Sequence, residues 1–302
     1  MPAWIHELVV APLALALAYR HAARALGGAR AAIELLALCG YGFALEWVAM
    51  AVFASHRYGA GWTLAPAGVP IAIAAVWAAV ITSAMALAVR AGAVSPLRRA
   101  LLAATLGIVL DLLMEPVAVR LGLWEWTPPG PWLAVPIGNF VGWAVIVGGY
   151  TFGAERWAGH GRFGAEATRR LALAAGAIAL LIAVGLLWTR LGAEALFAKG
   201  AGWAAWLVLL AAPLVLGRRT RATAAGSEPT LAERLGRTNG VAPAAVFTLV
   251  GLTFAIDALR LGGLELFAVA VGSLVVLTVM IYLNNFFRFV RALSFGESAS
   301  SS

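Results

Sequence analysis

The sequence predicts an all-α fold, a polytopic transmembrane helix bundle, and three observations lead to that class. The chain has 302 residues, of which 62% are hydrophobic, whereas soluble domains contain about 45–50%. Charged residues make up 12%, roughly half the usual share of about 25%, and the mean hydropathy is +0.90. The apolar residues also fall in stretches of about 20, the length that a helix needs to cross about 30 Å of hydrocarbon.

About nine spans are expected, and at least eight. The first is the weakest, because Arg20, His21 and Arg24 fall at its end, and the seventh is short and contains Pro213. The expected spans lie near residues 4–20, 31–54, 69–89, 100–121, 134–153, 171–189, 201–217, 242–259 and 265–287.

The distribution of basic residues predicts how the bundle is oriented. Loops after odd-numbered spans, together with the carboxyl-terminal tail, contain 17 of the 22 Lys and Arg residues. The positive-inside rule places that set in the cytoplasm, so the amino terminus is expected outside and the carboxyl terminus in the cytoplasm. The chain is rich in arginine and almost free of lysine, which suggests a bacterium with a GC-rich genome and hence the bacterial cytoplasmic (inner) membrane.

The whole chain, residues 1–302, is expected to form a single integral membrane domain, because no loop is long enough to build a second core. Residues 218–240 are rich in arginine and carry Pro229 and an Asn-Gly pair, which is typical of a cytoplasmic loop. Residues 292–302 are expected to be a flexible tail.

Charge and ligand spacing exclude several classes of function. The net charge of +8 does not indicate nucleic-acid binding, because the arginines lie between apolar segments and form no continuous stripe. The single cysteine, Cys39, excludes an intramolecular disulfide. No metal and no cofactor are expected, because the histidines show no metal-ligand spacing; they are His6, His21, His56 and His160.

Several acidic side chains lie inside expected spans, where each costs at least ~2.5 kcal/mol near the bilayer centre. Asp111 and Glu115 are four residues apart and therefore share one face of their helix. Two such carboxyls cannot both ionise cheaply, so one should keep its proton and serve as a general acid. Glu46 should lie at a similar depth. For Asp257 and Asn284 the favoured interpretation is a bond to a neighbouring helix.

A helix–loop–helix unit occurs twice, in residues 31–90 and 100–153, and both copies are expected to run in the same direction. In each copy an acid is followed by aromatic residues, a Val-Pro-Ile sequence and a tryptophan seven residues after the proline. The matching residues are Glu46, Tyr58, Trp62, Pro70 and Trp77 in the first copy, and Glu115, Trp124, Trp126, Pro136 and Trp143 in the second.

At these residues the sequence resembles the membrane carotenoid biosynthesis family that includes bisanhydrobacterioruberin hydratase and the bacterial γ-carotene hydratases. The resembling segments are 111–116, 122–126 and 135–143, together with Glu46, 56–58, Val69-Pro70 and Trp77. The resemblance implies a lyase that adds water to the terminal double bond of an acyclic carotenoid and produces a tertiary alcohol. Its partners would be a carotenoid or other isoprenoid lipid substrate and the membrane lipids.

That chemistry assigns expected roles to the residues. Asp111 and Glu115 are the candidate proton donors, and Glu46 is expected to orient a water molecule with help from Asn139. The aromatic faces can stabilise a carbocation, by about 2 kcal/mol when desolvated. The expected substrate-binding residues are Tyr58, Trp62, Trp77, Trp124, Trp126, Asn139 and Trp143.

Three alternatives stay open at the level of sequence. A membrane carotenoid cyclase of the lycopene type would use the same acid and the same cation but would end in ring closure. A lipid or proton-coupled transporter would use the acids to carry protons or ions. A structural membrane subunit would have no need of the acids.

Overall fold

The computed structural model describes residues 1–91, 93, 95–157, 163–198 and 229–294. Within these residues eight helices are long and apolar enough to cross a membrane, so the prediction of an all-α polytopic bundle is confirmed. The expected span at 201–217, the arginine-rich residues 218–228 and most of the expected tail lie outside the described residues, as do the side chains of Asn284 and Asn285.

The first span is longer than expected. It is a continuous helical segment formed by α1 (Ala3–Ile5), the π-helical turn η1 (His6–Val10) and α2 (Ala11–Leu26). The helix continues past residue 20 because His21 is buried and its Nε2 lies 2.9 Å from the carbonyl oxygen of Leu235. His21, which interrupts the apolar stretch in the sequence, thus makes a buried contact with another part of the chain.

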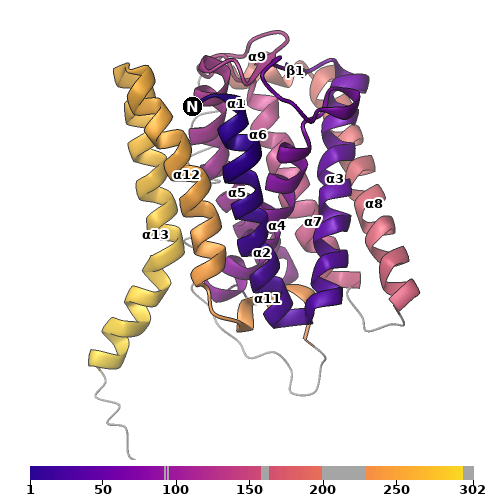
Figure 1. Ribbon diagram of the computed structural model, residues 1–302, viewed down its shortest axis with the longest axis vertical. Coiled ribbons are helices and arrows are strands. Elements are labelled where there is room, and N and C mark those ends of the chain that lie inside the picture. The colour runs from indigo at the N-terminus through magenta and orange to yellow at the C-terminus, as the bar shows by residue number, and fades with distance from the viewer. Residues whose placement is uncertain (92, 94, 158–162, 199–228, 295–302) are drawn as a thin grey trace, which may run out of the picture.

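The remaining spans surround a buried centre (Figure 1). Helices α4 and α5 are the most buried, whereas α8 and α13 are largely exposed and would face lipid. The spans are α3 (Gly28–Phe53), α4 (Ile71–Arg90), α5 (Pro96–Arg120), α6 (Ile137–Trp143) continued by η3 (Ala144–Gly148) and α7 (Gly149–Trp157), α8 (Phe163–Arg190), α12 (Val241–Leu261) and α13 (Leu264–Ser294). Shorter elements are η2 (Pro66–Gly68) and α9 (Ala193–Ala198).

Two three-residue strands close one end of the bundle, which we call the β end. Strand β1 (His56–Tyr58) follows α3, strand β2 (Trp124–Trp126) follows α5, and they pair antiparallel with His56 opposite Trp126. The two backbone segments approach closely just after the strands, because a Cβ on Gly59 would lie 2.1 Å from the carbonyl oxygen of Gly122. The pairing therefore holds the ends of α3 and α5 together.

The two helix–loop–helix units have the same direction in the structure. Helices α3 and α5 both end at the β end, and α4 and α6 both begin there, directly after Pro70 and Pro136. The tryptophans seven residues after those prolines meet, since the rings of Trp77 and Trp143 are 4.1 Å apart between centroids and inclined by 35°. The acids that end the first helix of each unit are therefore carried to the same level.

The opposite end is closed by a short helix that was not expected. Residues 218–240 were predicted to be a loop, but α11 (Leu231–Arg237) lies within them. A capping box starts this helix: the Thr230 hydroxyl accepts from the Glu233 backbone N–H, and the Glu233 carboxylate accepts from that of Thr230. Leu231 and Leu235 are buried. The sequence signal was the Thr-Leu-Ala-Glu capping box, hidden within an otherwise polar segment.

Replacing Arg99 should destabilise this end of the protein. Its guanidinium is buried and donates to Glu155 at 2.5 Å and to Glu233 at 2.6 Å. Arg99→Met would leave a buried carboxylate without its partner, which costs about 3–5 kcal/mol. Thermal unfolding in detergent should show a clearly lowered Tm, whereas Arg120→Met, at the exposed other end of α5, should not change it. Equal Tm values for the two variants would contradict the ion-pair assignment.

Candidate functional site

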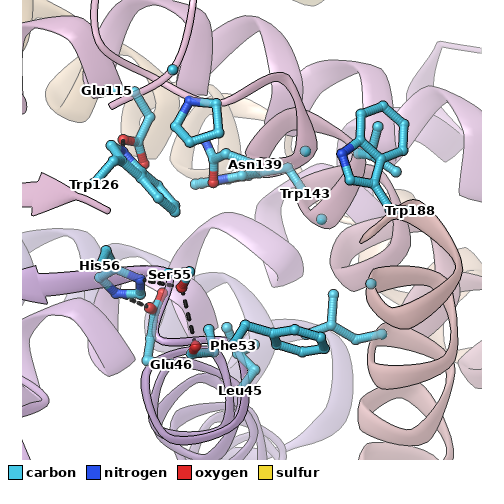
Figure 2. A pocket seen from close by; sticks show the side chains of 18 of the residues that line it. Leu45, Glu46, Phe53, Ser55, His56, Glu115, Trp126, Asn139, Trp143 and Trp188 are labelled. Carbon is cyan, nitrogen blue, oxygen red and sulfur yellow. Dashed lines mark hydrogen bonds and ion pairs between the residues drawn. The ribbon is translucent and has the colours of Figure 1, made fainter. Parts of the chain in front are cut away.

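A cavity of about 690 Å³ lies at the β end, between α3, α4, α5, α6 and α8 (Figure 2). Apolar and aromatic side chains form most of its wall, and the polar groups come mainly from the ends of α3, α5 and α6 and from the strands. The volume is within the range of about 300–1,000 Å³ typical of sites for small ligands.

Glu46, on α3, is held by two donors on separate oxygens. Its Oε1 accepts from Trp77 Nε1 at 2.6 Å, and its Oε2 lies 3.1 Å from His56 Nε2. The indole can approach because Gly42, one turn earlier, has no side chain; a Cβ there would lie 2.7 Å from Trp77 Cβ. Glu46 is therefore fixed in position from both sides.

The contacts of Ser55 determine the proton arrangement of His56. The Ser55 hydroxyl donates to the carbonyl oxygen of Ala49 at 3.1 Å, so its oxygen is left to accept from His56 Nδ1 at 2.9 Å. With Nδ1 as the donor, Nε2 faces Glu46 Oε2, and one proton must lie between them for a hydrogen bond to form. Ser55, His56 and Glu46 thus form a chain suited to accepting or passing on a proton (Figure 2).

Glu115, on α5, is held differently. A single oxygen, Oε2, accepts from Trp124 Nε1 and from Trp126 Nε1, each at 2.8 Å. The carbonyl oxygen of a protonated carboxyl is its better acceptor, so two donors on Oε2 leave Oε1 as the oxygen that would carry the proton. The same indole N–H groups can also stabilise the carboxylate that remains after the proton leaves.

Asp111 lies one turn behind Glu115 and does not line the cavity. It is fully buried, and its Oδ2 accepts from Asn139 Nδ2 at 2.7 Å. No N–H donor among the described residues reaches its Oδ1, and its side chain lies within hydrogen-bonding reach of the Glu115 carboxyl. Two negative charges side by side in such a place are unfavourable, so the pair is suited to holding one proton.

Aromatic rings surround the acids. The rings of His56 and Trp126 are 5.0 Å apart, and Tyr58 meets Trp124 edge-on at 6.0 Å. Burial raises the pKa of Tyr58 well above its usual value, as does the nearby Glu46 carboxyl. Its hydroxyl therefore stays protonated and acts as a donor toward Glu46.

Most of the residues predicted from sequence are brought together here. Eight of them line the cavity: Glu46, Tyr58, Trp77, Glu115, Trp124, Trp126, Asn139 and Trp143. Asp111 does not line the cavity and contacts two residues that do, Glu115 and Asn139. Trp62 does not line the cavity, because its indole donates to the carbonyl oxygen of Leu123 at 3.0 Å and fastens the loop after β1.

Four polar or aromatic residues of the cavity wall were not among the predicted site residues although their contacts shape the site: Ser55, His56, Trp188 and Glu194. The Ser55-His56 pair, nine and ten residues after Glu46, was a usable signal. Nothing in the sequence pointed to the other two. Glu194 accepts from the backbone N–H groups of Ile137 and Gly138 at 2.7 and 2.9 Å and from Trp188 Nε1 at 3.2 Å, so it fixes the start of α6. Within the described part of the chain, no group of three or more His, Cys, Asp or Glu side chains could hold a metal ion.

Comparison with protein families identifies the chain. The sequence model of the carotenoid biosynthesis protein family matches residues 6–211, about two thirds of its length. The chain belongs to that family. A search of curated proteins and a search of solved structures each gave no match.

Membership gives this carotenoid biosynthesis protein a role in making carotenoids. Every residue of the cavity wall lies inside the matched segment, as does Asp111, whereas α11, α12 and α13 lie beyond it. The part of the chain that the family shares is therefore the part that builds the cavity.

Proposed function

We propose that this protein is a carotenoid hydratase, which adds water to the terminal carbon–carbon double bond of an acyclic carotenoid and produces a tertiary alcohol. One observation carries the proposal: a single apolar cavity has an acid, Glu115, on one side and a proton-accepting chain of Glu46, His56 and Ser55 on another. Addition of water to an alkene needs both a proton donor and a site that holds water and takes up its proton.

The reaction begins with protonation of the alkene. Glu115 gives the proton on Oε1 to the less substituted carbon of the terminal double bond, which breaks the π bond and leaves a tertiary carbocation at the other carbon, the one that bears two methyl groups. The new carboxylate is stabilised by the indole N–H groups of Trp124 and Trp126. Faces of the surrounding aromatic rings stabilise the cation by about 2 kcal/mol.

Water then completes the addition. A water molecule held at Glu46 and His56 forms the new carbon–oxygen bond, and its surplus proton passes to the Glu46–His56 pair. Return of that proton to Glu115 restores the starting state, and His56 is close enough to Glu115 to interact with it electrostatically. Atoms and charge balance without an external oxidant or reductant.

Pigments extracted from a host that makes an acyclic carotenoid test this proposal against its rivals. A more polar, hydroxylated product is expected. A cyclic isomer of unchanged mass would favour a cyclase, for which the same acid and aromatic faces are suited. No chemical change, with movement of the lipid between membranes, would favour a transporter.

Trp126 and Trp62 have different hydrogen-bond partners, so we expect their phenylalanine variants to behave differently. Trp126→Phe removes one of the two donors to Glu115 and should lower the rate of product formation by about ten- to a hundredfold, because a hydrogen bond to a charged group is worth about 1.5–3 kcal/mol. Trp62→Phe removes a contact outside the cavity and should leave that rate nearly unchanged. Product per unit of membrane-inserted protein is the measurement, and equal rates in the two variants would contradict the site.

The protein lies in the bacterial cytoplasmic membrane in this proposal, with the β end outside and the carboxyl terminus in the cytoplasm. Arg90, Arg98 and Arg99 lie at the end opposite the β end, in agreement with the positive-inside rule. A reporter fused after Arg221 should give a cytoplasmic signal. A periplasmic signal would reverse the orientation.

A further inference from the structure

The cavity has an apolar side formed by α3 and α8, away from the acids. Its residues there are Val52 and Phe53 on α3 and Leu181, Val184 and Gly185 on α8. Helix α8 is the least buried of the eight spans. A single helix therefore separates this side of the cavity from the surroundings, which in a membrane are lipid chains.

Two residues that line the cavity are also exposed on the outer surface of the bundle, so the cavity reaches that surface there. Val52 is 52% exposed and Leu186 is 45% exposed, yet both line the cavity. They come from α3 and α8, two helices that pack against each other. The cavity thus reaches the apolar exterior between these helices, and Figure 2 shows the Phe53 ring extending toward α8 in that interval.

The Phe53 ring packs against Gly185 and fills the space between α3 and α8 at this level. A Cβ on Gly185 would lie 2.8 Å from Phe53 Cζ and 3.0 Å from Cε1, closer than real atoms approach. Gly176, earlier on the same helix, is exposed and has nothing within 4 Å of such an added atom. A side chain at residue 185 would therefore displace the Phe53 ring, whereas a side chain at residue 176 would meet no neighbouring atom.

We propose that the α3–α8 side of the cavity is a subsite for the apolar polyene chain of the substrate, which passes beside the Phe53–Gly185 contact, leaves the cavity at Val52 and Leu186, and continues into the membrane. A cavity of about 690 Å³ is of a size for a drug-like ligand, so it takes the end group of a long lipid and not all of it. The rest needs an apolar exit, and the described residues offer one here. The inference rests on the proposed function for the identity of the lipid.

Binding to an inactive variant tests the subsite. In the Glu115→Gln background, lycopene added in detergent should acquire an induced circular dichroism band in the visible region when the protein holds it. Adding Gly185→Leu should weaken that binding roughly tenfold or more, because the leucine would push the Phe53 ring into the cavity space that the polyene chain would occupy. Adding Gly176→Leu, the matched control on the same helix, should leave it unchanged.

A second-site change checks that the loss comes from blocked space. Phe53→Ala combined with Gly185→Leu should restore binding, because the leucine then occupies the volume of the removed ring. Val184 also lines this side of the cavity, so Val184→Phe should reduce the space there and weaken binding. This variant provides the test if the Gly185→Leu protein does not insert into the membrane. Unchanged binding by correctly folded Gly185→Leu and Val184→Phe, or no binding by the Glu115→Gln parent, would overturn the subsite.

The two proposals can fail separately. If the unmodified protein forms no alcohol but Gly185→Leu selectively loses lycopene binding, the subsite holds and the hydratase reaction is wrong. If the unmodified protein forms the alcohol and the Gly185→Leu variant forms it at the same rate, the reaction holds and the subsite is wrong.

Discussion

Glu115→Gln is expected to stop product formation while leaving the protein folded and inserted in the membrane. The amide is nearly the same shape as the acid, and its oxygen can still accept from Trp124 and Trp126. It cannot give a proton to carbon. Loss of a general acid costs about 10²–10⁴-fold in rate, so the alcohol should fall below detection in a pigment extract.

The matched control is Glu125→Gln, because Glu125 lies between Trp124 and Trp126 in the sequence but its side chain is exposed. Glu125 pairs with Arg57 at the surface and does not line the cavity. The control should keep the full rate of product formation, and both variants should unfold at the temperature of the unmodified protein. Full turnover by Glu115→Gln would remove Glu115 as the acid. Asp111→Asn should also lower the rate, although Asp111 acts through Glu115 and Asn139 and does not contact the substrate.

Glu46→Gln is expected to change the product as well as the rate. The amide oxygen can still accept from Trp77, and the amide nitrogen can donate to His56 Nε2, so the local hydrogen bonds are kept. Glu115 still makes the carbocation, but the water no longer has an anionic acceptor for its proton. Alcohol should fall by about 10²-fold or more, and products of proton loss or ring closure should appear in its place.

Glu265→Gln is the control for that variant, because it removes an exposed carboxylate at the same end of the bundle, on α13. Chromatography of the pigments, normalised to protein in the membrane, measures both the rate and the product ratio. An unchanged ratio of alcohol to other products in Glu46→Gln would show that Glu46 does not act on water.

The spans were predictable because apolar length is a local property of the chain. Helices α3, α4, α5 and α12 lie where their apolar stretches predicted them. The closing helix α11 was missed because a seven-residue helix gains most of its stability from packing against other elements. The strands are also too short to show a periodic pattern, so the pairing of His56 with Trp126 could not be foreseen.

For the site, the sequence indicated which residues gather but not how their roles divide. Asp111 and Glu115 share a face of α5 but lie one turn apart along it. Glu115 therefore lines the cavity, whereas Asp111 lies outside it and contacts Asn139, which does line it. Trp62 fitted the repeat, but the path of its loop turns the indole toward the Leu123 carbonyl oxygen. Trp188 and Glu194 reach the cavity only because α8 and α9 pack beside α6, which a local pattern does not report.

The repeat also explains why its two acids differ. Glu46 and Glu115 occupy matching places, but the residue one turn earlier is Gly42 in the first unit and Asp111 in the second. Gly42 admits Trp77, which donates to Glu46 beside His56. The second unit instead places an additional carboxyl next to Glu115. One unit thus supplies a proton acceptor and the other a proton donor.

The origin of the product oxygen tests the central claim most directly. Purified protein in detergent is given an acyclic carotenoid in water enriched with ¹⁸O, and the product is examined by mass spectrometry. Addition of water predicts an alcohol that carries one ¹⁸O atom, formed by the unmodified protein and not by Glu115→Gln. A product without ¹⁸O, such as a cyclic isomer of unchanged mass, would contradict it.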